Sequence, residues 1–326
     1  MTLFYLLILL LSFSLTWLYR KYALHKSLMD IPNDRSSHTV PTPRGGGVAV
    51  VLAWFGGLLW LFVQQQIDEN LFLAFLAGLP LVIISYLDDI YTLKPGLRFL
   101  VQAFSAAGAL WFLQGLHVVD FGFATISSVW LWTPVAFIAI LWAINLFNFL
   151  DGIDGYISSE VACIGLTLFA IFMDATALLL AIAIIGFLIW NWPKAKIFMG
   201  DVGSTLLGFN VAVFAIWYQN TQDVSVLFFL IITGAFWYDA TITLYRRWRN
   251  KEKLSEAHRK HAYQRLTQSG LSHQQVTIGL WGVNLALLGL AYVGILFSGF
   301  IWAAFILALL LLAAVMYYAD RRKEFS

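Results

Sequence analysis

Charged residues are scarce in this chain of 326 residues: they make up only 12% of it, whereas hydrophobic residues make up 60%. A soluble domain of this length carries about a quarter charged residues, so the composition excludes a soluble globular protein. Cysteine is almost absent as well. The single cysteine, Cys163, lies inside an apolar run, which excludes a disulfide framework and a cysteine metal site.

Long apolar runs fill most of the sequence and predict an integral membrane protein. A helical span needs roughly 17–25 mostly apolar residues, and about eleven runs meet this criterion. They cover residues 3–19, 46–63, 71–87, 98–115, 130–149, 156–172, 175–191, 203–218, 224–244, 275–295 and 299–318. The predicted fold class is therefore an all-α bundle of about eleven transmembrane helices, forming one polytopic domain over residues 1–326.

Two of these divisions are inferred from length. Residues 156–191 and 275–318 are each too long for one helix at ~1.5 Å per residue, and we expect breaks at Asp174 and at Ser298-Gly299. The first span has no basic residue before it and no small-residue cleavage site, so it is interpreted as a retained anchor whose N-terminus lies outside.

Basic residues are missing from every second connecting segment. When the spans alternate, all 20 Lys and Arg fall on one side, which the positive-inside rule identifies as cytoplasmic. The C-terminus falls on this side too. So do the polar segments in which we expect the site: about 20–45, 88–97, 150–156, 192–202 and 245–274.

Asp88 and Asp89 end the third span. The C-terminus of a helix is electronegative, so two carboxylates there are repelled. A divalent cation or a role as proton acceptor would relieve this penalty, although two solvated interfacial acids would also explain the pair. We expect the larger role for Asp88, which is nearer the span.

The run from Asn145 to Gly155 carries the strongest signal. Asn145 and Asn148 lie one turn apart near the inner end of a span, and Asp151 and Asp154 follow between glycines that permit a turn. Amide and carboxylate groups gathered in this way can bind a nucleobase edge, a ribose or a hydrated metal. A plain helix-ending loop is the alternative.

Asp201 directly precedes a predicted span in the run Phe198-Met199-Gly200-Asp201. It is either an ordinary helix N-cap or a ligand of Mg²⁺, which favours one or two carboxylates together with substrate phosphate oxygens. The two interpretations are compatible with each other.

Arg44 and the three glycines 45–47 open the second span. Glycines at a helix N-terminus let a phosphate group approach backbone N–H groups, or they allow close packing of helices. Both interpretations stay open for this segment.

The last large polar loop carries His258, His261 and Arg265. If this loop is helical, the two histidines share a face and Arg265 follows one turn later. Arginine binds phosphate oxygens bidentately, so we expect this group to contact a substrate, although topology alone explains most basic residues here.

At these motifs the chain resembles the polyprenyl-phosphate N-acetylhexosamine-1-phosphate transferase superfamily, a bacterial glycosyltransferase family. The resemblance runs from Pro41 to Leu266, and the asparagine/DGIDG and FMGDVGS runs are its most specific parts. It implies a helical bundle with a cytoplasmic cleft in the bacterial inner membrane. It also implies transfer of a sugar 1-phosphate from a UDP-sugar to undecaprenyl phosphate, with release of UMP and with Mg²⁺, or alternatively Mn²⁺, as cofactor.

The resemblance also implies roles for individual residues. Taken together with the motifs, it predicts Asp88, Asp89 and Asp154 as catalytic residues and Asp201 and Asp88 as metal ligands. The predicted substrate-binding residues are Asn145, Asn148, Asp151, Arg44, His258, His261 and Arg265.

The histidine loop departs from one branch of this superfamily. Where the phospho-N-acetylmuramoyl-pentapeptide transferases carry three consecutive histidines, this chain has His258-Arg259-Lys260-His261, which resembles the enzymes that initiate O-antigen synthesis. An N-acetylhexosamine or its 6-deoxy relative is therefore the expected sugar, with the pentapeptide transferase as the alternative.

An ion-coupled transporter is the alternative from another class, because intramembrane acids often mark ion pathways. The expected partners are the UDP-sugar, undecaprenyl phosphate and the lipid bilayer, with no nucleic acid, and a homodimer is left open.

Overall fold

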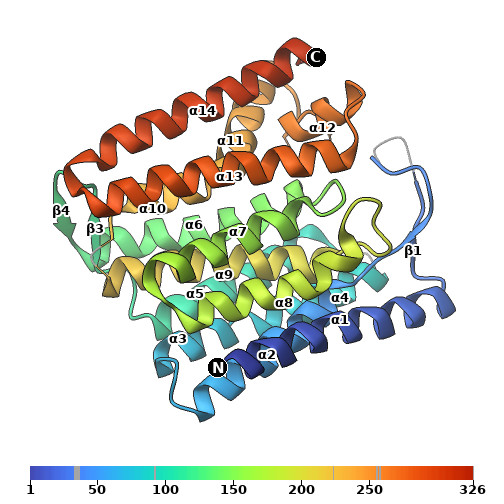
Figure 1. Ribbon diagram of the computed structural model, residues 1–326, viewed down its shortest axis with the longest axis horizontal. Helices are drawn as coiled ribbons and strands as arrows, with labels where there is room; N and C mark the ends of the chain where they lie inside the picture. The colour runs from blue at the N-terminus through green and yellow to red at the C-terminus, as the bar shows by residue number, and fades with distance from the viewer. Residues whose placement is uncertain (33–36, 92, 223, 255, 257, 326) are drawn as a thin grey trace.

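Helices account for nearly all of the regular structure in the computed structural model, which describes residues 1–326 except 33–36, 92, 223, 255, 257 and 326. They run side by side in one bundle (Figure 1). The first seven helices are α1 (Thr2–His25), α2 (Gly47–Val63), α3 (Glu69–Leu76), α4 (Leu79–Tyr91), α5 (Pro95–Phe112), α6 (Val129–Leu150) and α7 (Tyr156–Phe172). The others are α8 (Ala175–Asn191), α9 (Asp201–Thr221), α10 (Val226–Ile232), α11 (Gly234–Arg249), α12 (Ala262–Gln268), α13 (His273–Leu296), the 3₁₀ turn η1 (Ser298–Phe300) and α14 (Ile301–Arg322).

Two short antiparallel pairs of strands mark opposite ends of the bundle (Figure 1). β1 (Met29–Asp30) pairs with β2 (Thr42–Pro43), and β3 (Val118–Asp120) pairs with β4 (Thr125–Ser127). We call the end that carries β1, β2 and α12 the loop end, and the end that carries β3 and β4 the hairpin end. The segments that hold the predicted site residues all lie at the loop end, although parts of three of them (33–36, 92, 255 and 257) are outside the described residues.

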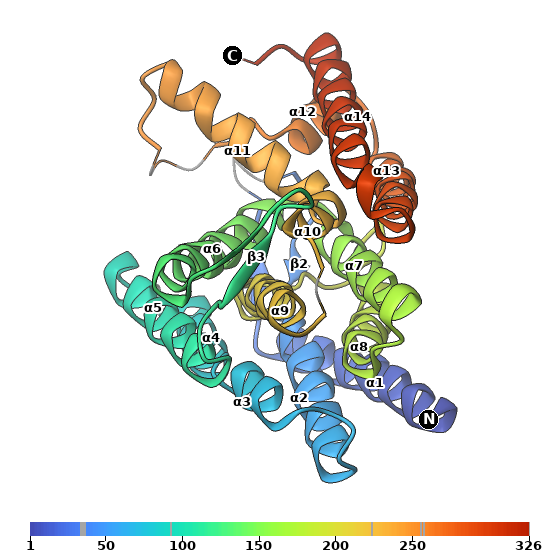
Figure 2. The ribbon, with the colours of Figure 1, turned by 90° about the vertical axis from the view of Figure 1, so that its left-hand side faces the viewer.

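Helix α9 forms the axis of the bundle, and Figure 2 shows it surrounded by α2, α3, α4, α6, α7, α8 and α10. Of its most apolar stretch, 83% is buried inside the protein, whereas the corresponding figure is 17% for α1 at the periphery. The first residue of this central helix is Asp201. Because α9 is the central helix, its first residue places a carboxylate in the middle of the loop end.

The chain is a multi-span membrane protein. Within the described residues, six helices are long and apolar enough to cross a membrane, with α3 and α4 counted as one, and α10–α11 would make a seventh. Three further apolar helices, α2, α7 and α8, have 17 residues each. A helix or helix pair lies at each of the eleven predicted spans, but length and composition support crossing for six or seven of them only.

The predicted span over residues 224–244 is not one continuous helix. The chain bends by 82° between α10 and α11, where Thr233 ends one helix and Gly234 begins the next. Glycine tolerates such a kink, and α11 carries arginines in its last turn, which favour a position near water.

The expected break at Asp174 is present. Helix α7 ends at Phe172, and the Asp174 carboxylate caps α8 by accepting hydrogen bonds from the backbone N–H groups of Thr176 (2.6 Å) and Ala177 (3.2 Å). An aspartate that satisfies free N–H groups at a helix start favours a new helix over continuation of the old one.

A buried polar pair joins α7 to α13. Asn284 donates a hydrogen bond from Nδ2 to Oε2 of Glu160 at 2.7 Å, and Glu160 is fully inaccessible to solvent. The pair lies among apolar side chains, where an unpaired polar group is costly. It therefore fixes the position of α13 along α7.

We predict that Asn284→Leu destabilises the protein by about 1–3 kcal/mol, because it leaves the Glu160 carboxyl group buried without its donor. Thermal unfolding in detergent should show a lower Tm. The double variant Glu160→Leu/Asn284→Leu should recover much of the loss, since no unpaired polar group then remains. An unchanged Tm in the single variant would contradict this role.

Candidate active site

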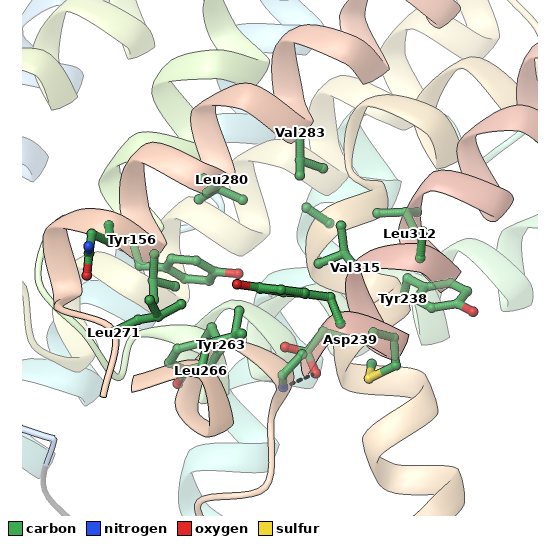
Figure 3. A pocket seen from close by; sticks show the side chains of 18 residues that line it. Tyr156, Tyr238, Asp239, Tyr263, Leu266, Leu271, Leu280, Val283, Leu312 and Val315 are labelled. Carbon is green, nitrogen blue, oxygen red and sulfur yellow. Dashed lines mark hydrogen bonds between the residues drawn. The ribbon is translucent and has the colours of Figure 1, made fainter. Parts of the chain in front are cut away.

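Two cavities lie near the loop end, and their linings differ in chemistry. One has a volume of about 550 Å³ and is enclosed by α7, α11, α12, α13 and α14. Figure 3 shows that its walls are tyrosine rings and aliphatic side chains, with Asp239 as its one carboxylate. A charged soluble ligand would lose its hydration there with little in return, so the apolar cavity is not the candidate site despite its size.

The second cavity is a polar cleft of about 300 Å³. Residues from five separate segments line it, and six of them are residues predicted from the sequence: Arg44, Asp89, Asn148, Asp151, Asp154 and Asp201. With Asp30, five carboxylates line this cleft at the end of an apolar bundle, and so many negative groups need compensating charge. This cleft is the candidate active site.

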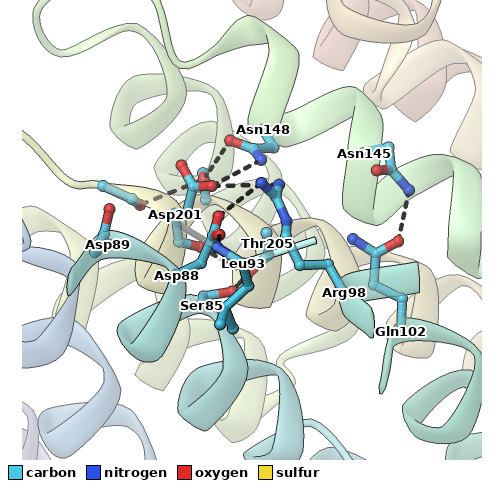
Figure 4. Close-up of polar contacts among 12 residues, drawn as sticks. Ser85, Asp88, Asp89, Leu93, Arg98, Gln102, Asn145, Asn148, Asp201 and Thr205 are labelled. Atoms are coloured by element: carbon cyan, nitrogen blue, oxygen red, sulfur yellow. Dashed lines mark hydrogen bonds and ion pairs between the residues drawn. The ribbon is translucent and has the colours of Figure 1, made fainter. Parts of the chain in front are cut away.

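Asp88 does not line the cleft, in contrast to the prediction. Its carboxylate accepts a hydrogen bond from the Leu93 backbone N–H (2.6 Å) and pairs with Nη1 of Arg98 at 2.6 Å (Figure 4). The other guanidinium nitrogen, Nη2, lies 3.4 Å from Oδ2 of Asp201. Arg98 therefore links the acidic pair of α4 to the start of α9, and both oxygens of Asp88 already have partners.

Asp89 faces the cleft instead. Its backbone carbonyl accepts a hydrogen bond from Nη2 of Arg44 (2.6 Å), and Oδ1 lies 3.9 Å from Nη1. The other oxygen, Oδ2, is buried and makes no hydrogen bond within the described residues. Asp89, and not Asp88, is thus the acid of the pair that faces the cleft, since neighbouring helical side chains diverge by about 100° and Arg98 engages Asp88.

Asp201 does not cap its own helix by a side-chain hydrogen bond. Its Oδ2 accepts from Nδ2 of Asn148 at 3.4 Å and pairs with Arg98. Asn148 is held from the other side, because its Oδ1 accepts a hydrogen bond from the Ser204 hydroxyl (3.3 Å). The N-cap interpretation of Asp201 is therefore wrong, and its carboxylate lines the cleft instead.

Asn145 lies outside the cleft, one turn deeper along α6. Its Nδ2 donates to Oε1 of Gln102 (2.9 Å) and to the Leu141 carbonyl (2.7 Å), which ties α6 to α5 (Figure 4). The structure thus divides the two asparagines into one that packs helices together and one that faces the cleft.

Asp151 ends α6 and is partly buried among the other acids. Burial, and then repulsion by Asp201, Asp89 and Asp154, raises its pKa to about 8. The adjacent Gly152 is required by packing, because a Cβ at this position would overlap the hydroxyl group of Tyr263. The turn after α6 therefore brings a carboxylate to a place where a bound cation would stabilise its charged form.

Asp154 lines the cleft, but its oxygens are engaged. Oδ2 accepts a hydrogen bond from the Ala195 backbone N–H (3.0 Å), and Oδ1 lies 3.3 Å from Nδ1 of His273. Only 8% of the residue is exposed. These contacts place Asp154 at a junction between loops. They do not favour the direct catalytic role that was predicted for it.

His258 and His261 do not line the cleft. His261 is buried and its Nδ1 lies 3.4 Å from Oδ1 of Asp239, while the ring of His258 packs on that of His261 at 4.9 Å. Burial, followed by repulsion from His261 and Arg247, lowers the pKa of His258 to about 4. The two histidines are therefore neutral or internally paired, and direct substrate contact is not supported.

Arg265 is also directed away from the cleft, so the structure corrects its predicted role. The guanidinium group is buried and binds Asp320 (2.5 Å), the Lys323 carbonyl (2.9 Å) and the Lys260 carbonyl (3.1 Å). Arg246 pairs with both oxygens of the same Asp320, at 2.8 and 2.9 Å. Arg265 thus joins the histidine loop to the end of α14.

The three glycines of residues 45–47 serve packing. The N–H groups of Gly46 and Gly47 donate to the carbonyls of Phe198 (2.9 Å) and Met199 (2.8 Å). A Cβ on Gly47 would lie 2.5 Å from the backbone nitrogen of Gly203. The amide groups of Gly46 and Gly47 are therefore unavailable to a phosphate, and α2 meets α9 at close range.

The cleft fits a divalent cation only together with a ligand. No group of three or more His, Cys, Asp or Glu side chains in the described part of the chain is arranged as a preformed metal site. Mg²⁺ commonly takes one or two carboxylates and completes its shell with water and substrate phosphates. The unpartnered Oδ2 of Asp89 and the carboxylate of Asp201 meet that requirement.

Several contributors to this region were not predicted as site residues, among them Arg98, Gln264 and His273. Gln264 and His273 line the cleft, and Arg98 binds two of its carboxylates. The sequence does contain a signal for Arg98, because a basic residue at the start of a span lies shortly after Asp88 and Asp89 and can pair with one of them. Nothing in the sequence relates His273 to Asp154, 119 residues away.

We predict that Asp320→Asn loosens the histidine loop, because the buried guanidinium of Arg265 loses its charged partner. Hydrogen–deuterium exchange should become faster at the backbone amides of α12 and residues 258–261. Glu324→Gln, at an exposed acid nearby, is the matched control and should change nothing. Unaltered exchange in Asp320→Asn would show that the ion pair does not stabilise this loop.

Comparison with known proteins supplies the family. The model of "Glycosyl transferase family 4" matches residues 71–219, a range that contains Asp89, Asp151 and Asp201. Among curated relatives, "Undecaprenyl-phosphate alpha-N-acetylglucosaminyl 1-phosphate transferase" of Yersinia pestis is 31% identical over 312 residues, which cover 87% of this chain and 82% of the relative.

Two further relatives carry similar names. The protein of the same name from Thermotoga maritima is 31% identical over 265 residues (78% of this chain and 79% of the relative). "Probable undecaprenyl-phosphate N-acetylglucosaminyl 1-phosphate transferase" of Bacillus subtilis is 26% identical over 283 residues (82% and 77%). Because relatives with about 31% identity align along most of both chains, this protein belongs to glycosyl transferase family 4.

Proposed function

We propose that this enzyme transfers a sugar 1-phosphate from a UDP-sugar to undecaprenyl phosphate, giving undecaprenyl-diphosphate-sugar and UMP. One observation carries the proposal: Asp89, Asp151 and Asp201, from three separate motifs, converge with Asn148 on a single polar cleft at the end of an apolar bundle. A lipid phosphate and a soluble nucleotide can meet only at the surface of a membrane. The relatives' names supply the acceptor and the transferred group.

The donor side of the reaction is assigned to the cleft. Phosphoryl transfer depends mainly on positioning and on stabilising charge. Asn148 can orient a polar donor group through its amide, and Arg44 reaches the same cleft with a guanidinium group suited to phosphate oxygens. Asp154 keeps the lining segments together.

The acceptor side is assigned to Arg98. This residue lies at the start of α5, next to the end of α4, and its guanidinium already binds the carboxylates of Asp88 and Asp201. A lipid phosphate that arrives from the bilayer can replace one of these carboxylates, because arginine binds both groups with the same fork of donors.

Mg²⁺ is the proposed cofactor, with Mn²⁺ as an alternative. Asp201 and Asp89 would hold it, and Asp151 lies close enough to be repelled by both of them. When bound, such an ion polarises phosphoryl oxygens and screens their charge. Asp88 is not proposed as a ligand, since Arg98 and the Leu93 amide occupy its oxygens.

We also propose the eleven-span topology, with the N-terminus outside, and the cleft and C-terminus on the cytoplasmic side of a bacterial inner membrane. The one-sided distribution of the 20 Lys and Arg residues supports this orientation. So does the placement of all predicted site segments at the loop end, where a cytoplasmic UDP-sugar would have access.

A sugar nucleotide with a small N-acetylated sugar is the proposed donor. The cleft of about 300 Å³ suits it better than a pentapeptide-bearing donor, and the protein lacks three consecutive histidines in the loop before α12. A transporter is less well supported, because transporter sites tend to lie at the midplane of the membrane, whereas this cleft lies at one end of the bundle.

The experiment that tests the function uses purified protein, undecaprenyl phosphate and a panel of UDP-sugars, with release of UMP as the readout. We expect UMP with a UDP-N-acetylhexosamine or a 6-deoxy relative, only in the presence of acceptor and Mg²⁺, and none with UDP-N-acetylmuramoyl-pentapeptide. Efficient turnover of the pentapeptide donor would identify the alternative branch. Absence of UMP with every donor would refute the proposal.

For the acids, we predict that Asp89→Asn and Asp201→Asn each lower kcat by about 10²-fold or more, since each removes a charge that faces the reacting phosphates. Asp88→Asn should lower kcat less and reduce thermal stability, because Arg98 loses its closest partner. Glu256→Gln, at an exposed acid, is the control. An inactive Asp88→Asn variant beside an active Asp89→Asn variant would restore the order of importance expected from the sequence.

A further inference from the structure

His273, the first residue of α13, is a polar residue of the cleft that belongs to none of the motifs discussed above. Its Nε2 lies 3.1 Å from the carbonyl oxygen of Ser37, 236 residues earlier in the chain. Its Nδ1 lies 3.3 Å from Oδ1 of Asp154 and 3.5 Å from the Asp154 backbone nitrogen. One imidazole ring therefore contacts two segments that line the cleft.

The Ser37 carbonyl determines that Nε2 of His273 is protonated. A carbonyl oxygen can only accept, so Nε2 must carry the proton that it shares with Ser37. Nδ1 can accept from the Asp154 N–H when the ring is neutral, or donate to the Asp154 carboxylate when the ring is charged. The contact with Ser37 is the same in both cases, so it does not depend on the protonation of the ring.

Asp154 extends this contact to two more elements. Its Oδ2 accepts a hydrogen bond from the Ala195 N–H (3.0 Å) in the segment before α9, and its carbonyl accepts from the Thr277 hydroxyl (3.0 Å) on α13. His273 thus completes a junction that joins the N-terminal loop, the turn after α6, the segment before α9 and the start of α13.

The segment that His273 contacts lines one part of the cleft. Residue Ser37 is followed by His38, whose ring packs against Phe198 at 4.8 Å and whose Nε2 is buried without a hydrogen-bond partner in the described part of the chain. The segment ends at Arg44, which binds the Asp89 carbonyl. Residues 37–44 therefore form a strap that is attached to His273 at its start. At its end it is attached to β1, to the Phe198 amide and to the Asp89 carbonyl.

We propose that His273 is a positioning residue for the donor: it attaches the strap of residues 37–44 so that His38 and Arg44 face the bound UDP-sugar. This inference rests on the proposed function. The strap and the His273 junction both line the cleft, to which the donor is assigned. The acceptor is assigned to Arg98 at the ends of α4 and α5, which the junction does not touch.

Steady-state kinetics tests the proposal with both substrates varied. His273→Ala should raise the donor KM about tenfold, the usual effect of one lost hydrogen bond, while kcat and the acceptor KM stay within about threefold of wild type. His273→Gln can place an N–H group near the position of Nε2 and should recover most of the donor affinity. His273→Asn reaches only the Nδ1 side and should behave like the alanine variant.

Gln274→Ala, at the exposed neighbour on α13, is the matched control and should resemble wild type. The proposal is overturned if His273→Ala keeps the wild-type donor KM, or if His273→Gln is as impaired as His273→Ala. It is also overturned if the donor and acceptor KM rise together.

A second readout does not require activity. Hydrogen–deuterium exchange at the backbone amides of residues 37–44 should be faster in His273→Ala than in wild type and in Gln274→Ala. If wild type releases no UMP, the proposed function fails while this measurement still tests the strap. If UMP is released and exchange in the strap is unchanged, the role of His273 fails by itself.

Discussion

Negative charge at the end of an apolar bundle is the constraint on which the arrangement of this protein depends. Asp201 begins the central helix, and Asp88, Asp89 and Asp151 end helices whose C-termini are already electronegative. Arg98 neutralises part of this charge by binding Asp88 and Asp201. The acids that face the cleft, Asp89, Asp151 and Asp201, keep only part of their charge compensated, and this is why we propose a cation beside the phosphate groups there.

The segments around the cleft are not stabilised by apolar packing alone, because they lie outside the bundle. Polar contacts over long sequence separations hold them instead: Asp154 with Ala195 and His273 on one side, and Asp320 with Arg246 and Arg265 on the other. The first group borders the cleft, and the second fixes the histidine loop. A buried carboxylate with several donors is well suited to this task, since each additional hydrogen bond offsets part of its desolvation.

Family membership and geometry contribute different things to the functional argument. The relatives indicate the reaction class, whereas the contacts decide which side chains are free to take part in it. His258, His261 and Arg265 belong to a motif of the superfamily, yet here their nitrogens are buried or engaged with Asp239, Asp320 and backbone carbonyls. Their role in this structure is to support the α12 region. The cleft itself is formed by acids, amides and Arg44.

The sequence by itself determined the membrane class, the positions of the helices, the break at Asp174 and six of the residues that line the cleft, because apolar length and the acids at span ends are local properties of the chain. It did not determine the bend between α10 and α11, nor which acid of the pair at 88 and 89 faces the cleft. It also missed His273 and misplaced Asn145 and Arg265. These features depend on the direction of a side chain and on partners 43 to 236 residues away, and only the packed tertiary structure brings such partners together.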